Sequence, residues 1–166
     1  MIRKATINDL DSIMKIVGKI ITEMATYNNF QWDENYPQAR DFDADIKKGE
    51  LFVSVRENEV VGFICINKDE PNEYEGLKWS STEEALVIHR MGVSTDYRHA
   101  GIGTELVGLA DELARRSDVN YLRTDTYSLN TKVQRLFQKC DYTFVGEMNF
   151  LSKEKPFYCY EKVLGL

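Results

Sequence analysis

The chain has few of the residues that build disulfide frameworks and metal sites. Its three cysteines, Cys65, Cys140 and Cys159, form no CxxC pair, and its two histidines are His89 and His99. An odd and sparse set of cysteines argues against a disulfide framework and for a reducing compartment. Because the histidines lack both a thiol pair and an i, i+4 spacing, we expect no metal site.

Long apolar runs and an excess of positive charge are also missing. No uncharged stretch approaches the roughly 18 residues of a membrane-spanning helix, and the charged N-terminus (Arg3, Lys4, Asp9, Asp11) is not that of a signal peptide. Lys plus Arg number 21 against 27 Asp plus Glu, a net charge of −6, so sequence-independent binding of nucleic acid is not expected. We expect a cytoplasmic protein with a cationic or amine partner, no nucleic acid and no membrane.

The sequence does contain the composition of an ordinary folded domain. It has 166 residues, of which 43% are hydrophobic and 29% charged, without repeats, low-complexity tracts or a Pro/Gly-rich linker. This length and composition predict a single domain over residues 1–166.

Periodicity and turn residues predict the order of the secondary-structure elements. Strands are expected at residues 2–5, 51–56, 60–67, 85–93, 121–126, 142–147 and 157–164. Helices are expected after a capping box of Thr6 and Asp9, from Pro37 to Lys48, at 101–116 and at 130–140, with a loop at 68–84. The strand–helix–strand step around 101–116 predicts a parallel pair inside a mixed sheet.

Residues 98–104, between a buried strand and the start of a helix, carry the chemical signal. Gly101 and Gly103 lack a Cβ, so that a phosphate can approach the backbone closely. The N–H groups of the first helical turn and the helix dipole add positive potential, and Arg98 adds a cation suited to phosphate. The segment therefore predicts a pyrophosphate-binding turn.

Two common nucleotide motifs do not fit this turn. A Rossmann fingerprint would require its third glycine at Leu106, and a Walker A loop would require a lysine directly before Thr104. The pattern R-x-x-G-x-G instead resembles that of the GNAT superfamily of N-acetyltransferases. The residues that match this family are Gly92, Val93, Tyr97, Arg98, Gly101, Ile102, Gly103 and Leu106, with Asn130 at the head of the next helix.

The resemblance covers nearly the whole chain and implies both a fold and a cofactor. The fold is mixed α/β (α+β), a mostly antiparallel sheet of about six to seven strands with about four helices, split between two parallel strands. Acetyl-CoA would bind at that split, with backbone groups near Met91 and Val93 bonded to the pantetheine arm. The remaining cofactor-binding residues it implies are Arg98, His99, Ala100, Gly101, Ile102, Gly103, Thr104, Asn130 and Phe137.

The groups that move protons depart from the family pattern. Where many members carry a basic glutamate, the chain has Val87, so His89 two residues later is the first candidate base and Glu84 the second. Phe137 occupies the position of the usual tyrosine acid. A thiol with a pKa of about 8.5 can leave as thiolate without such an acid; Cys140 and Tyr127 are the alternative acids.

The acceptor would lie between residues 28–36 and 68–84, where Trp32, Tyr36 and Tyr74 offer aromatic walls among acidic side chains. Such a rim suits a polyamine, an aminoglycoside-like amine or a peptide amine, although the same acids could form an ordinary solvated surface. We expect an N-acetyltransferase that moves an acetyl group from acetyl-CoA to a primary amine by direct attack in a ternary complex. The sequence does not decide between a monomer and a homodimer. The alternative is a non-catalytic acyl-CoA-binding or sensing module.

Overall fold

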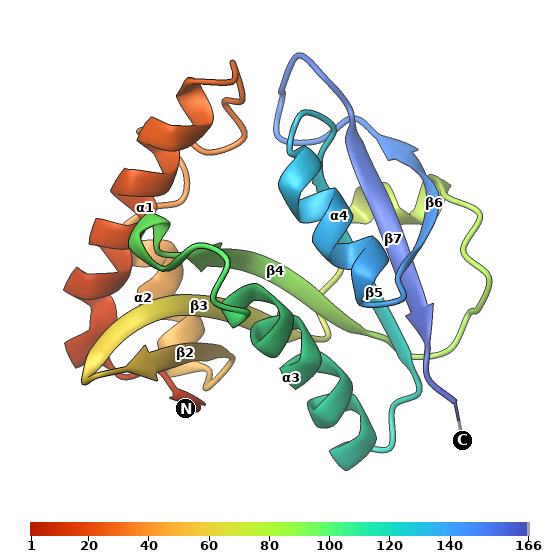
Figure 1. The fold of residues 1–166 in the computed structure, drawn as a ribbon. Coiled ribbons are helices and arrows are strands. Elements are labelled where there is room, and N and C mark those ends of the chain that lie inside the picture. Colours follow the sequence, from red (N-terminus) through yellow and green to blue (C-terminus); the bar gives the residue numbers. More distant parts are fainter. Residues whose placement is uncertain (166) are drawn as a thin grey trace. The chain divides into compact units, whose positions relative to one another are not determined.

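The computed structural model describes residues 1–165 and contains one mixed sheet (Figure 1). The seven strands found in this range are β1 (Ile2–Lys4), β2 (Leu51–Arg56), β3 (Glu59–Asn67), β4 (Leu86–Val93), β5 (Tyr121–Tyr127), β6 (Thr143–Met148) and β7 (Phe157–Val163). Their order in the sheet is β1-β2-β3-β4-β5-β7-β6. The β4–β5 pair is parallel, while β1–β2, β2–β3, β5–β7 and β6–β7 are antiparallel. The predicted fold class is confirmed.

Helices and short turns connect these strands. The helices are α1 (Leu10–Ala25), α2 (Ala39–Lys47), α3 (Ile102–Arg116) and α4 (Thr131–Lys139), and the 3-10 turns are η1 (Ile7–Asp9), η2 (Asn72–Gly76) and η3 (Thr95–Tyr97). Within residues 1–165, none of the helices has the length and apolar character to cross a membrane.

The chain divides into two compact units. The first unit contains residues 1–65 and 90–106, and the second contains residues 66–89 and 107–165. Since β3, β4 and α3 each run through both units, neither unit is a continuous stretch of chain. The single domain expected from length stays a prediction.

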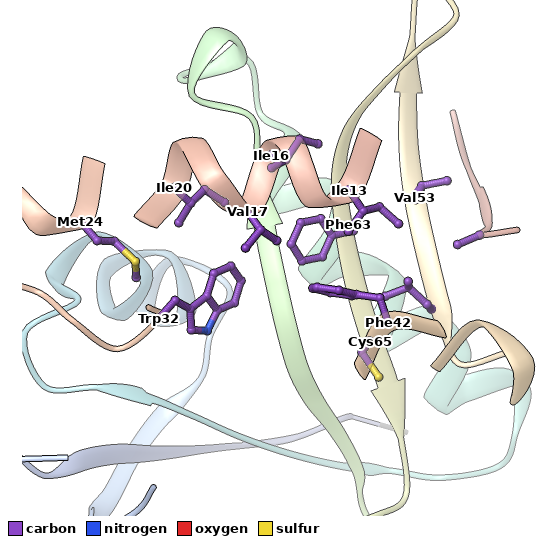
Figure 2. Packing of buried hydrophobic residues seen from close by; sticks show 12 residues of the cluster. Ile13, Ile16, Val17, Ile20, Met24, Trp32, Phe42, Val53, Phe63 and Cys65 are labelled. Carbon is purple, nitrogen blue, oxygen red and sulfur yellow. The ribbon is translucent and has the colours of Figure 1, made fainter. Parts of the chain in front are cut away.

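In the first unit, a capping box starts the first helical segment as the sequence predicts. The Thr6 backbone N–H donates to Asp9 Oδ2 at 2.7 Å, and the Arg3 guanidinium pairs with the same carboxylate at 2.8 and 2.9 Å. The apolar face of α1 then packs on rings from α2 and β3, as Figure 2 shows. The buried members of that face are Ile13, Ile16, Val17, Ile20 and Met24.

The start of α2 differs from the prediction that Pro37 opens it. The Tyr36–Pro37 peptide is cis, and α2 begins at Ala39 after an N-cap at Gln38. The Gln38 N–H donates to Asp41 Oδ2 at 2.7 Å, so a second capping box starts the helix two residues after the proline. Gly49, with φ of +70°, follows the end of α2.

In the second unit, the side-chain alternation of β5 and β7 creates two faces. Asp125 lies opposite Cys159 and Tyr127 opposite Phe157 on one face, which packs against Tyr74 of η2. The sequence predicted only a loop around Tyr74, because a single buried tyrosine in a polar segment leaves no periodic signal. The ring of Phe137 in α4 instead contacts Tyr160, which belongs to the opposite face of β7.

Candidate active site

The turn that precedes α3 is built from two residues in the left-handed region. His99 has φ of +63° and Gly101 has φ of +79°, and both are exposed. A Cβ placed on Gly101 would meet no atom within 4 Å, so the turn is open in front of this residue. Ile102, 1% exposed, anchors the start of α3 in the core. The first N–H groups of α3 have no partners within the helix, and together with the helix dipole they favour an anion.

A basic side chain from β2 supports this turn. Arg56 donates to the carbonyl oxygen of Ala100 at 3.2 Å and pairs with Glu105 in the first turn of α3 at 2.8 Å. The two contacts hold the backbone on both sides of Gly101, which keeps its conformation defined before any ligand arrives.

Arg98 forms an ion pair within the protein. Its guanidinium donates to Glu23 Oε1 of α1 at 2.8 Å, which offsets part of its positive charge. Its Nε–H, however, is buried and has no hydrogen-bond partner among residues 1–165. A buried donor at the first residue of an open turn fits an anionic oxygen such as that of a diphosphate.

On β4, exposure changes where the pairing with β5 stops. Leu86, Val87 and Ile88 pair with Leu122, Arg123 and Thr124, and the last carbonyl, that of Ile88, accepts a hydrogen bond from Thr124 Oγ1 at 3.0 Å. The three paired residues of β4 are buried, whereas the next three, His89, Arg90 and Met91, are only half-buried. The family resemblance implied such a split between β4 and β5, with free backbone groups near Met91 and Val93.

The two predicted bases have different surroundings. His89 Nε2 lies 2.6 Å from Asn67 Oδ1, so Nε2 carries the proton in this arrangement and Nδ1 is the basic nitrogen. Glu84 forms an ion pair with Lys68 at 2.9 Å, and its side chain is 61% exposed. Glu84 is therefore a surface group beside the start of β4.

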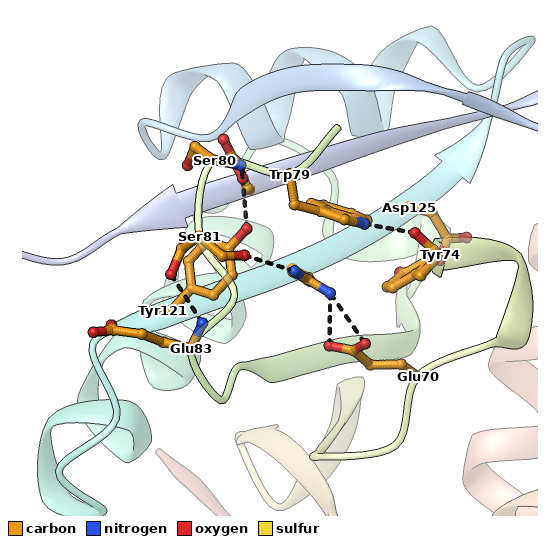
Figure 3. Close-up of polar contacts among 10 residues, drawn as sticks. Glu70, Tyr74, Trp79, Ser80, Ser81, Glu83, Tyr121 and Asp125 are labelled. Carbon is orange, nitrogen blue, oxygen red and sulfur yellow. Dashed lines mark hydrogen bonds and ion pairs between the residues drawn. The ribbon is translucent and has the colours of Figure 1, made fainter. Parts of the chain in front are cut away.

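Sequence reasoning missed a carboxylate in β5. Asp125 is partly exposed and accepts a hydrogen bond from the Tyr74 hydroxyl at 2.6 Å (Figure 3). Desolvation raises the pKa of Asp125 to about 6; the Tyr74 hydrogen bond opposes this rise and the charge of Glu73 adds to it. The signal in the sequence was Arg123 and Asp125, two charged residues in alternate positions of an otherwise buried strand.

The three predicted acceptor walls are not open aromatic surfaces. Trp32 is 6% exposed and stacks on Phe63 with a centroid distance of 6.1 Å, so little of this ring is open to a ligand. The Tyr36 hydroxyl accepts from Arg90 at 2.8 Å, and Tyr74 is 1% exposed. All three side chains are held by protein neighbours.

The second unit nevertheless contains a pocket of about 340 Å³. It lies along the segment between β3 and β4, where the sequence placed one side of the acceptor site. Arg123 forms one wall: its guanidinium stacks 4.2 Å from the centre of the Trp79 ring and pairs with Glu70 at 3.0 Å. The residues that line the pocket are Glu70, Tyr74, Glu75, Leu77, Trp79, Ser81, Thr82 and Arg123.

Comparison with known proteins decides the family. The family model described as "Acetyltransferase (GNAT) family" matches residues 19–142. The chain belongs to the GNAT acetyltransferases. A putative acetyltransferase from Staphylococcus aureus Mu50 is 30% identical, with 99% of each chain covered and a TM-score of 0.79.

More distant GNAT relatives share the fold. A GNAT acetyltransferase from Streptococcus agalactiae has a TM-score of 0.87 at 23% identity, covering 100% of this chain and 96% of its own. A putative acetyltransferase from Salmonella typhimurium, solved with its cofactor acetyl-CoA, has a TM-score of 0.72 at 14% identity, covering 99% and 94%. The uncharacterized N-acetyltransferase YesJ of Bacillus subtilis (strain 168) is 20% identical over 146 residues, 86% of this chain and 81% of YesJ.

Two further residues of this GNAT chain that the sequence assigned to the cofactor have structural partners. Asn130 caps α4, accepting the Val133 N–H at 3.3 Å. Phe137 is 2% exposed, and its ring contacts those of Tyr142 and Tyr160 at centroid distances of 5.6 and 5.7 Å. We therefore assign packing to Phe137 and leave it out of the cofactor site.

One group of potential metal ligands occurs among the described residues. Ligand atoms of Asp45, Glu50 and Cys65 lie within 4.8 Å of one another. Asp45, however, is already neutralised by Arg90 at 2.7 and 2.8 Å, and burial raises the pKa of the Cys65 thiol to about 12. A protonated thiol and a paired carboxylate are poor ligands, so we assign no cation here.

Proposed function

We propose that this GNAT protein transfers an acetyl group from acetyl-CoA to a primary amine. The observation that carries the proposal is the open, left-handed turn at the head of α3, held by Arg56 and facing the first N–H groups of the helix. The Salmonella relative, solved with acetyl-CoA, supports the choice of cofactor over other diphosphates.

In this proposal the diphosphate lies on the turn and the acyl arm runs along β4. The backbone of residues 99–104 and the unpaired Nε–H of Arg98 would hold the diphosphate. Half-buried Met91 and Val93 would offer backbone groups to the pantetheine amides. Acetyl-CoA supplies an acetyl group activated as a thioester, and a held amine can attack this group directly in a ternary complex.

The proposal needs no tyrosine acid. The departing sulfur can leave as thiolate, because a thiol pKa of about 8.5 makes it a far better leaving group than an alkoxide. The positive end of α3 would stabilise negative charge on the cofactor. Phe137 thus does not contradict catalysis, but its lack of a hydroxyl is the observation that favours the second candidate, a non-catalytic acyl-CoA-binding module.

The first test concerns the turn. Gly103→Val should weaken acetyl-CoA binding at least tenfold, about 1.4 kcal/mol, because a side chain would then stand where the diphosphate approaches. Gly108→Val is the matched control: it lies in the same helix, is exposed, and a Cβ there meets no atom within 4 Å. We expect the control to bind normally in titration calorimetry. Wild-type affinity in a folded Gly103→Val protein would refute the assignment of the turn.

The second test separates the enzyme from the binding module. Release of CoA is followed with acetyl-CoA and a panel of alkylamines, polyamines, amino sugars and peptides. Turnover with an amine, together with the acetylated product in mass spectrometry, is the expected result. Binding of acetyl-CoA without turnover on any amine would favour the module instead.

A further inference from the structure

The second unit holds a carboxylate that the family resemblance did not assign. β4 and β5 pair through Val87 with Arg123 and Ile88 with Thr124, and the ladder then ends. His89 and Asp125 occupy the next position on each strand. Because aligned side chains of parallel strands point to the same face, these two share the face of Val87 and Arg123.

The surroundings of Asp125 combine enclosure with access. The carboxylate is bonded to the Tyr74 hydroxyl at 2.6 Å, and Cys159 lies opposite it on β7. Tyr74 belongs to an apolar cluster with Val87, Tyr127, Met148, Phe157 and Cys159. Asp125 itself is nonetheless partly exposed. A carboxylate that is enclosed by apolar side chains, in a residue that is itself partly exposed, can receive an ammonium group or a proton.

We propose that Asp125 is the catalytic base of the acetyl transfer and that Tyr74 is the residue that positions it. This inference rests on the proposed function. The ammonium of the acceptor amine gives its proton to the Asp125 carboxylate, and the amine nitrogen bonds to the acetyl carbon. The carbon–sulfur bond breaks and its electron pair stays on sulfur. The departing CoA thiolate takes the second proton that the nitrogen must lose, so that the products are the neutral amide and the CoA thiol.

The charged and titratable neighbours agree with this role. Tyr74 and Glu73 face Asp125 from η2, Cys159 faces it from β7, and Arg123 precedes it on the same face of β5. Arg123 is engaged by Glu70 and by the carbonyl of Ser81 at 2.9 Å. With a pKa of about 6, Asp125 is ionised at neutral pH yet basic enough to hold a proton, as an effective base must be.

The experiment is the pH dependence of kcat/KM in four proteins: wild type, Asp125→Asn, Tyr74→Phe and His89→Gln. In wild type, kcat/KM should rise with pH through about 6 and then level, since the base must be deprotonated. Asp125→Asn should lower the value at pH 7 about 10²-fold. It should also replace the plateau with a steady rise toward the pKa of the amine, because only free amine then reacts. His89→Gln should retain the rise of kcat/KM near pH 6, the acidic limb of the profile.

Tyr74→Phe distinguishes positioning from mere structure. Loss of the hydroxyl removes the hydrogen bond that lowers the pKa of Asp125, so the acidic limb should move to higher pH while the plateau survives. Glu147→Gln, which removes an exposed carboxylate from the same unit, controls for net charge and should leave the profile unchanged.

Acetyl-CoA affinity measured on each variant keeps this inference separate from the proposed function. A limb near 6 that persists in Asp125→Asn, or that disappears in His89→Gln, overturns the assignment of Asp125 while acetyl transfer stands. An unmoved limb in a folded Tyr74→Phe protein overturns the role of Tyr74. Absence of turnover on any amine in wild type would instead refute the proposed function.

Discussion

The ring of Phe137 is enclosed by aromatic neighbours, and this decides what a hydroxyl at its tip would do. Tyr142, in contact with it, already has a buried hydroxyl without a hydrogen-bond partner in the described part of the chain. A second buried hydroxyl without a partner costs roughly 1–3 kcal/mol. The family pattern suggested a catalytic position, but the packing around the ring indicates a structural one.

Phe137→Tyr should therefore lower the free energy of unfolding by about 1–3 kcal/mol without raising turnover. Urea denaturation and CoA release measure the two effects. Phe144→Tyr is the control: Phe144 is 51% exposed, so its new hydroxyl would reach water and stability should change by less than about 0.5 kcal/mol. A stable Phe137→Tyr protein with a hundredfold gain in turnover would contradict the packing assignment and show that an acid step limits the natural enzyme.

Among the elements, α2 is held by an ion pair that sequence patterns do not predict. The Asp45 carboxylate of α2 forms a bidentate ion pair with the Arg90 guanidinium of β4, at 2.7 and 2.8 Å. The same guanidinium also donates to the Tyr36 hydroxyl. The Asp45 side chain is 7% exposed. Both residues lie in the first unit, and their contact joins segments 45 positions apart in the chain.

Asp45→Ala should destabilise the protein by about 3–5 kcal/mol, because the guanidinium of Arg90 would remain largely buried without its partner. Asp43→Ala on the same helix is the matched control. Asp43 pairs with Lys47 at 2.8 Å, but the lysine side chain is 75% exposed, so its loss should cost less than about 1 kcal/mol. Equal losses in the two variants, measured by urea denaturation, would contradict the role assigned to the buried pair.

The sequence could predict those elements whose signals lie within a few neighbouring residues. α1 and the hairpin of β2 and β3 follow from apolar periodicity and turn residues, which act over a few neighbouring positions. Asp141, two residues after the end of α4, has φ of +69°. The burial of Tyr74 and the pairing of Asp45 with Arg90 depend on distant segments, so no local pattern could reveal them. For the site, the turn before α3 was predictable, whereas Asp125 needed the register of β4 and β5.

Over the whole chain, the division into two units raises the question of how many cooperative domains there are. The chain passes between the units after residues 65, 89 and 106. All three points fall inside an element: β3 changes unit after Cys65, β4 after His89 and α3 after Leu106. Unfolding one unit alone would therefore cut a strand ladder and a helix in their middle. This cost favours one cooperative transition, as expected for a single domain.

Each unit contains one of the two tryptophans, which allows a direct test of cooperativity. Trp79→Phe leaves Trp32 as the probe of the first unit, where it stacks on Phe63. Trp32→Phe leaves Trp79 as the probe of the second, where it lies under Arg123. In each variant the urea midpoint from fluorescence should coincide with that from far-UV circular dichroism, which reports on both units. A fluorescence transition that precedes the dichroism transition in either variant would show that its unit unfolds separately, and the chain would then contain two domains joined through β3, β4 and α3.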